Sequence, residues 1–162
     1  MGRVVSEGEI VRLREEAARE GRRFVFTNGC FDVIHAGHLH VLREAKGAGD
    51  LLLVAVNGDD SVRRLKGEGR PLVGEEDRAE LIAALEPVDF VVLFHEETPG
   101  RIIDLLKPDV LVKGGDYGPN EIVGAGTVRA AGGEVLVIPL KEGLSTRSLI
   151  ARILERYGNR PD

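Results

Sequence analysis

The chain has 162 residues, of which 43% are hydrophobic and 30% charged, and its formal net charge is −5. This length and composition are typical of one globular domain with its own core, and the negative charge disfavours a nucleic-acid-binding protein. A single cysteine cannot form an internal disulfide, which indicates a reducing compartment such as the cytoplasm. No apolar run approaches the ~20 residues of a membrane-spanning helix, and the charged first residues are not typical of a signal peptide.

Apolar runs and amphipathic stretches alternate along the chain. Ser6–Glu20 combines helical spacing of apolar residues with a Ser-x-x-Glu capping pattern, so residues 1–22 are expected to form an N-terminal helix. Short apolar runs predict strands at Arg23–Asn28, Asp50–Asn57, Val88–Phe94, Asp109–Lys113 and Glu134–Leu140. Further helices are predicted at Gly37–Ala48, Asp59–Leu65, Glu75–Leu85, Pro99–Leu106, Glu121–Ala131 and Ser145–Tyr157. Residues 23–157 are therefore expected to form the main domain and residues 158–162 a frayed tail.

This alternation predicts an α/β fold, a single-domain, doubly wound, five-stranded parallel sheet with helices on both faces. In such folds ligands bind at the carboxyl ends of the strands, where the strand order reverses. The residues that directly follow each strand are therefore the candidates for a functional site.

The first predicted strand leads into the run Asn28-Gly29-Cys30-Phe31-Asp32-Val33-Ile34-His35-Ala36-Gly37-His38. His35 and His38 stand at the expected start of a helix, whose first-turn amides and dipole favour an anion. Gly37 between them lets a phosphate approach the backbone. The pattern indicates a phosphoryl site with two imidazoles. A polar helix start with two ordinary histidines is the plainer alternative, and a zinc site lacks a third ligand at recognisable spacing.

The stretch TNGCFDVIHAGH resembles the Gly-x-Phe-Asp-x-x-His-x-Gly-His signature of the cytidylyltransferase-like nucleotidyltransferases. The similarity continues over roughly Arg23–Ile153, where VAVNGDDSVRRLKGEGRP, DVLVKGGDYGP, GGEVLVIPL and EGLSTRSLI look like the adenylyltransferase domain of the bifunctional heptokinase/adenylyltransferases. The resemblance implies a Rossmann-like sandwich that, with Mg²⁺, transfers AMP from ATP to D-glycero-D-manno-heptose 1-phosphate, a sugar 1-phosphate. The products would be pyrophosphate and ADP-heptose for lipopolysaccharide assembly. Because the chain is too short for the kinase domain, a free-standing enzyme is expected.

The resemblance also implies roles for individual residues. Lys66, in a loop interrupted by Gly and Pro, would act with His35 and His38 in catalysis by neutralising phosphate charge. The nucleotide would be bound by Asn28, Gly29, Cys30, Phe31, Asp32, His35, Gly37, His38, Gly115, Asp116, Gly143, Leu144, Ser145 and Thr146. The acceptor would be bound by Lys66, Arg78, Lys113 and Asp116. The triphosphate would hold Mg²⁺, with Asp32 either ordering the loop or helping to position the ion.

The last predicted helix is preceded by Gly143-Leu144-Ser145-Thr146-Arg147, which resembles the family element Gly-Ile-Ser-Thr-Thr. Leu144 replaces the isoleucine and Arg147 the second threonine, and a guanidinium still suits phosphate. Leu140-Lys141 stands where cytidylyltransferases carry an arginine, which favours the heptose type. The plainer readings are a helix N-cap for Ser145, a surface ion pair for Arg78 and a structural turn after Lys113.

The sequence leaves the substrates open. CTP could replace ATP, and the acceptor could be glycerol 3-phosphate, phosphoethanolamine or a flavin phosphate. A nucleotide-binding sensor without catalysis is the alternative of another class, although both histidines and the Ser-Thr element are present. A homodimer is expected from the resemblance, with neither nucleic acid nor membrane as partner. Cys30 is not expected to act as a nucleophile, because the reaction needs no covalent step.

Overall fold

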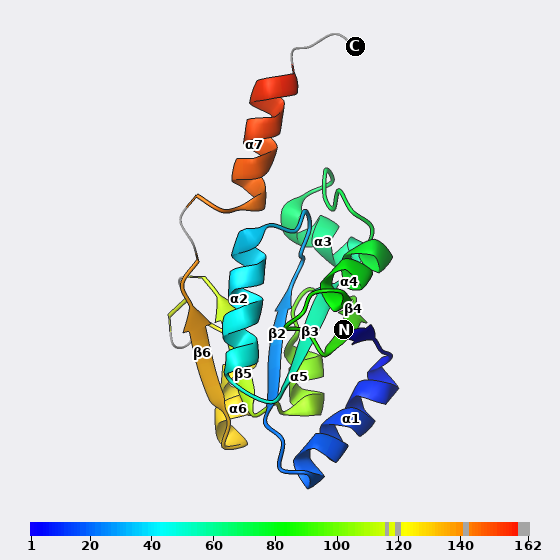
Figure 1. Ribbon diagram of the computed structural model, residues 1–162, viewed down its shortest axis with the longest axis vertical. Helices are drawn as coiled ribbons and strands as arrows, with labels where there is room; N and C mark the ends of the chain where they lie inside the picture. The colour runs from blue at the N-terminus through cyan, green and yellow to red at the C-terminus, as the bar shows by residue number, and fades with distance from the viewer. Residues whose placement is uncertain (116, 119–120, 141–142, 159–162) are drawn as a thin grey trace.

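An all-parallel sheet lies at the centre of the fold, with the strand order β1-β4-β3-β2-β5-β6 (Figure 1). The computed structural model describes residues 1–115, 117–118, 121–140 and 143–158. Its strands are β1 Arg3–Val4, β2 Phe24–Gly29, β3 Leu51–Asn57, β4 Phe90–Phe94, β5 Val110–Gly114 and β6 Glu134–Ile138. Its helices are α1 Glu7–Arg19, α2 Ala36–Gly47, α3 Asp59–Lys66, α4 Glu75–Ala83, α5 Gly100–Leu106, α6 Ala125–Ala130 and α7 Thr146–Tyr157. The predicted doubly wound α/β fold is confirmed.

The sheet has one strand more than the sequence predicts. β1 pairs with β4 at the edge of the sheet, with Arg3 opposite Phe90 and Val4 opposite Val91. A strand of two exposed residues shows neither an apolar run nor an alternation, so the apolar pattern contains no sign of it. The N-terminal segment therefore holds a strand as well as the expected helix.

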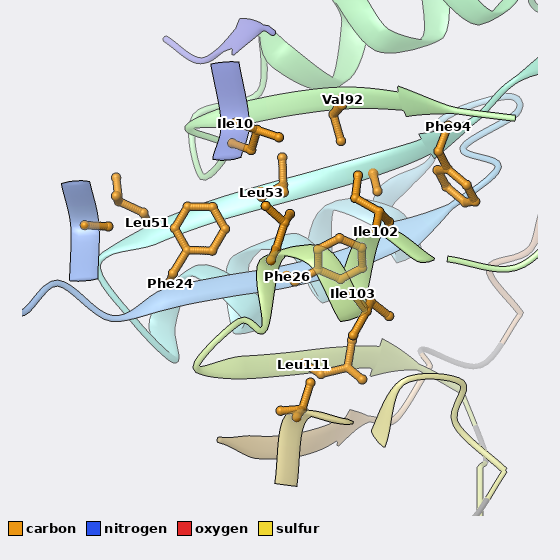
Figure 2. Close-up of a cluster of buried hydrophobic side chains, with 14 of the residues drawn as sticks. Ile10, Phe24, Phe26, Leu51, Leu53, Val92, Phe94, Ile102, Ile103 and Leu111 are labelled. Atoms are coloured by element: carbon orange, nitrogen blue, oxygen red, sulfur yellow. The ribbon is translucent and has the colours of Figure 1, made fainter. Parts of the chain in front are cut away.

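Side chains alternate between two apolar layers, one on each face of the sheet. Phe24 and Phe26 of β2 join one cluster, which α1, α5 and α6 cover (Figure 2). Val25, between them, joins the second cluster, against α2 and α4. Every residue of β3 is buried, since helices cover both of its faces. This explains why the central strands read as unbroken apolar runs.

The strand order reverses between β2 and β5. The chain runs from β2 to β3 and β4 on one side, then crosses to β5 and β6 on the other. Because β2 and β5 are neighbouring parallel strands, the loops that follow them lie side by side at the carboxyl end of the sheet. This is the place where such folds bind ligands.

Two helices differ from expectation. The helix predicted over Glu121–Ala131 is confined to α6, because Gly124 adopts a φ of 84° directly before it. α7 has the expected range but buries none of its side chains, and Figure 1 shows it extending away from the sheet. Within the described residues, no helix is long and apolar enough to cross a membrane.

Candidate functional site

The loop after β2 has an unusual backbone. Phe31 and Val33 adopt φ values of 51° and 59°, in the left-handed region that residues other than glycine rarely enter. Asp32 lies between them, and its side chain has no exposed surface. The loop is therefore held in a conformation that its own residues do not favour, which requires contacts from elsewhere in the chain.

The two histidines of the motif cap the helix that follows. His35 is the N-cap of α2, and its Nδ1 accepts a hydrogen bond of 3.1 Å from the Gly37 amide. Nδ1 of His38 accepts one of 3.3 Å from the His35 amide. Because each Nδ1 is an acceptor, each neutral ring carries its proton on Nε2. The rings stack with centroids 3.9 Å apart, so two N–H donors stand together at the helix start.

Both imidazoles are neutral at pH 7. Burial, assisted by the neighbouring His35, lowers the pKa of His38 from 6.5 to about 4. Burial also lowers the pKa of His35. A neutral imidazole still donates through Nε2, and a bound phosphate favours the charged form and raises the pKa again. The pair can therefore respond to negative charge that approaches or builds up beside it.

The segment before α7 meets these histidines. His35 and Ser145 line one cavity of about 50 Å³, together with Gly143, Leu144 and three residues of α7. A Cβ on Gly37 would lie 2.9 Å from the His35 ring and 3.3 Å from Cβ of Leu144. The start of α2 and the segment before α7, which the sequence predicts to bind one triphosphate, are thus in contact. Figure 1 shows the first turn of α7 above that of α2.

The hydroxyls of this segment already have partners. Ser145 is the N-cap of α7, and its Oγ accepts a hydrogen bond of 3.0 Å from the Ser148 amide. Thr146 Oγ1 donates one of 2.9 Å to the carbonyl oxygen of Asp32. The plainer reading of Ser145 as a cap is correct for this structure, and its contact with phosphate stays a prediction.

The ends of β2 and β5 are joined by polar side chains. Lys113 Nζ donates a hydrogen bond of 2.7 Å to Asn28 Oδ1. Burial lowers the pKa of Lys113, an effect that a charge on Cys30 opposes. Gly115 follows with a φ of 135°, and its amide donates to Ile138 of β6. Asp116, predicted to bind nucleotide and acceptor, lies outside the described residues.

Cys30 and Lys66 also lie near the carboxyl ends of the strands. Burial raises the pKa of the Cys30 thiol, and the charges of Lys66, Arg78 and Arg70 offset only part of that effect. The thiol is therefore protonated at neutral pH, which agrees with the expectation that it is no nucleophile. Lys66 is exposed at the end of α3 and close enough for its charge to act on Cys30.

Arg78 is buried and hydrogen-bonded within the protein. Its side chain is fully buried and donates hydrogen bonds to the carbonyl oxygens of Val73 and Cys30 and to Oδ1 of Asp59. The ion pair with Asp59 is therefore buried and not on the surface, and a contact of Arg78 with the acceptor stays a prediction. The guanidinium joins the loop after β2 to the segment before α4.

Three further residues, Arg70, Leu72 and Val73, contact the motif without any sign in the sequence. All of them donate hydrogen bonds to the carboxylate of Asp32. Two of these donors are backbone amides, which any residue type supplies, so no sequence pattern could have identified them.

A larger hollow, of about 450 Å³, lies between the first turns of α3 and α4. Five carboxylates line it, against Arg63 and His95: Asp59, Asp60, Glu75, Glu76 and Asp77. This excess of negative charge repels a triphosphate. The histidines therefore stay the candidate phosphate site, although the cavity beside them is smaller.

The chain is similar to known proteins over most of its length. The family model described as cytidylyltransferase-like matches residues 26–151, which include both histidines and the start of α7. The bifunctional protein HldE of Pelobacter propionicus is 52% identical over 147 residues, or 91% of this chain and 30% of that protein. The HldE protein of Shewanella amazonensis is 51% identical over 154 residues, or 95% of this chain and 32% of that protein. The chain thus spans less than a third of these relatives.

Two solved structures have the same fold. The lipopolysaccharide core biosynthesis protein of Thermoplasma volcanium has a TM-score of 0.61 at 33% identity, covering 75% of this chain and 98% of that one. Pantoate-beta-alanine ligase from Francisella tularensis, solved in complex with beta-gamma ATP and beta-alanine, has a TM-score of 0.63 at 11% identity. The likeness covers 100% of this chain and 81% of that one. The second likeness supports the fold alone. Because the motif is present and the family model matches most of the chain, the chain belongs to the cytidylyltransferase-like family of nucleotidyltransferase enzymes.

Proposed function

We propose that this enzyme transfers AMP from ATP to a sugar 1-phosphate, D-glycero-D-manno-heptose 1-phosphate, to give ADP-heptose and pyrophosphate. Identities of about 50% to HldE proteins over nearly the whole chain support the choice within the family. The likeness to a lipopolysaccharide core biosynthesis protein points to the same class of acceptor. The observation that carries the proposal is that His35 and Ser145, far apart in sequence, line one small cavity, which supports phosphate binding between them.

The proposed reaction is a direct in-line displacement. An anionic oxygen of the acceptor phosphate forms a bond to the α-phosphorus of ATP, and the bond from that phosphorus to the β-phosphate bridge oxygen breaks. Pyrophosphate leaves with the electron pair. Because the attacking oxygen is already an anion near neutral pH, no strong base is needed, and catalysis rests on positioning and charge stabilisation.

Each candidate residue has a proposed role that follows from its position. The Nε2–H groups of His35 and His38 would donate to the α-phosphate and the leaving oxygen as negative charge builds there. Lys66 and the first turn of α7, with Ser145 and Thr146, would hold the outgoing phosphates. Lys113 would bind the acceptor phosphate from the end of β5.

Mg²⁺ is proposed to enter with the nucleotide, held mainly by its phosphate oxygens. Both oxygens of Asp32, the carboxylate of the motif, already accept hydrogen bonds from the chain, so this side chain does not suit a metal ligand. When bound, the ion supplies charge neutralisation on the phosphates. We further propose a homodimer in the cytoplasm, as the resemblance implies; light scattering of the purified chain tests the dimer.

The reaction is tested by pyrophosphate release across a panel of nucleotides and acceptors. We expect release with ATP and heptose 1-phosphate to exceed that with CTP, or with glycerol 3-phosphate, phosphoethanolamine and a flavin phosphate, by at least ~10²-fold in kcat/KM. Preference for another pair would reassign the substrate within the same chemistry. Tight ATP binding without pyrophosphate release from any acceptor would instead identify a nucleotide sensor.

A further inference from the structure

We propose that Asp32 is a positioning residue that fastens the segment behind Lys66 to the loop that carries His35 and His38, and that it does not ligate the metal. The inference rests on the proposed nucleotidyl transfer and deepens it. It starts from a carboxylate with no exposed surface, in the strained turn between β2 and α2.

The carboxylate is saturated by one distant segment. Its Oδ1 accepts hydrogen bonds from the amides of Leu72, at 3.0 Å, and Val73, at 3.1 Å. Its Oδ2 accepts from Nε of Arg70 and from the Leu72 amide. Burial acts to raise the pKa of Asp32, but these hydrogen bonds and the Arg70 charge outweigh it and lower the pKa below its ordinary value. Asp32 is thus an anion whose acceptor positions are filled before any ion arrives.

The backbone around Asp32 is tied to two more segments. Its carbonyl oxygen accepts from Thr146 Oγ1 in the first turn of α7. Two residues earlier, the carbonyl oxygen of Cys30 accepts a hydrogen bond from Arg78, whose Nε also donates to the Val73 carbonyl oxygen at 2.8 Å. The loop after β2, the segment 70–73 and the start of α7 are therefore joined at a single point. Each of these is next to a group proposed to bind phosphate.

Lys66 stands at the end of this connection. α3 ends at Lys66, Gly67 turns the chain with a φ of 99°, and the Arg70 amide donates to the Gly67 carbonyl oxygen at 3.0 Å. A short turn therefore separates Lys66 from the residues that Asp32 holds. Without the carboxylate, the segment after Lys66 loses this anchor, and we expect Lys66 to be positioned less well relative to the histidines.

The variant Asp32→Asn tests this connection with little change of shape. An asparagine replaces one carboxylate oxygen by an NH₂ donor that faces the Arg70 guanidinium, and it removes the negative charge. The bond to Arg70 is therefore lost and the hold on segment 70–73 weakened, while the backbone carbonyl oxygen remains for Thr146. The matched control is Asp89→Asn. Oδ2 of Asp89 likewise accepts from a backbone amide, Leu52 at 2.7 Å, and from a cation, Lys46, but at the amino ends of β3 and β4.

For Asp32→Asn we expect kcat/KM for ATP to fall about 10²-fold, the size of effect that a misplaced group produces. Asp89→Asn stays within about twofold of wild type. In a double-mutant cycle with Lys66→Ala, the loss caused by Asp32→Asn becomes much smaller, because Asp32 acts through Lys66. Fully additive losses overturn the proposal. So does a raised Mg²⁺ requirement for half-maximal activity in Asp32→Asn, which would make Asp32 a ligand.

A second measurement needs no reaction. In the unliganded chain, Asp32→Asn speeds amide hydrogen exchange of residues 70–73 at least ~10-fold, while exchange in β3 and β5 is unchanged. If the wild type releases no pyrophosphate, the proposed function fails and this measurement still tests the anchor. Unchanged exchange at residues 70–73 overturns the anchor, whatever the activity.

Discussion

The imidazoles of His35 and His38 lie stacked, with their centroids 3.9 Å apart and their planes inclined by 24°. Burial lowers the pKa of both rings, and the neighbouring His35 lowers that of His38 further. The arrangement suits a pair of neutral donors that face a phosphate. The roles of these two side chains can be tested one at a time.

His38→Ala is expected to lower turnover by ~10²-fold or more, because a donor to the developing charge is removed. The fold survives, since the ring is only partly buried and its hydrogen bond is local. Pyrophosphate release and circular dichroism measure the two effects. His40→Ala, on the same helix, is the control and keeps near wild-type turnover. Equal turnover in both variants would contradict the role given to His38.

Acid is expected to destabilise the fold through His38 before the carboxylates titrate. In the unfolded chain this ring takes up its proton at the ordinary pKa of 6.5, and in the folded chain only at about 4. The unfolded state therefore binds more protons between these values, and the free energy of unfolding falls as the pH drops from 6.5 to 4, by about 3 kcal/mol. Urea unfolding at several pH values measures the slope. His38→Asn should flatten it; the same slope in both proteins would refute this assignment.

Arg78→Met is expected to lower the free energy of unfolding by about 3 kcal/mol, because it leaves a carboxylate and two carbonyl oxygens without a buried donor. The control is Arg101→Met. Arg101 pairs with Glu7 and Glu96, but its side chain is 52% exposed, so less than about 1 kcal/mol is lost. Denaturant melts of the two variants measure the difference. Similar losses would show that the Arg78 contacts contribute little.

Gly37→Ala is expected to lower kcat/KM roughly 10-fold, because the new Cβ must displace the His35 ring or Leu144 and so separate the two sides of the site. Gly47→Ala, at the end of the same helix, adds a Cβ where no atom lies within 4 Å. That control should keep its activity and gain up to about 1 kcal/mol in stability from helix propensity. Full activity in Gly37→Ala would mean that the close approach is not needed.

The fold could be predicted because its central strands are covered on both faces. A fully buried strand such as β3 has to be apolar throughout, and the amphipathic stretches between such strands have to be helices that cover them. β1 was missed because two exposed residues carry no such pattern. The start of α6 was misplaced because Gly124 is compatible with helical spacing but adopts a backbone angle that a helix does not.

The site could be predicted only where it is continuous in sequence. The histidines and Gly37 occupy one loop and one helix turn, so their spacing alone brings them together. The burial of Arg78 could not be predicted because its partners include Cys30, which lies 48 residues away. Asp32 accepts hydrogen bonds from backbone amides about 40 residues later in the sequence, and no side-chain pattern predicts such a contact. Tertiary structure, rather than residue type, decides such contacts.

β1 also has a consequence for how the protein behaves at high concentration. β4 carries the uncharged run Phe90–Phe94, and without a neighbour its free edge would be an apolar template for another chain. β1 covers the start of that edge, and the Val5 amide extends the cover by donating to Val91 at 2.8 Å. Arg3 places a charge on the new outer edge. Two residues with no part in the chemistry thus protect the sheet against aggregation.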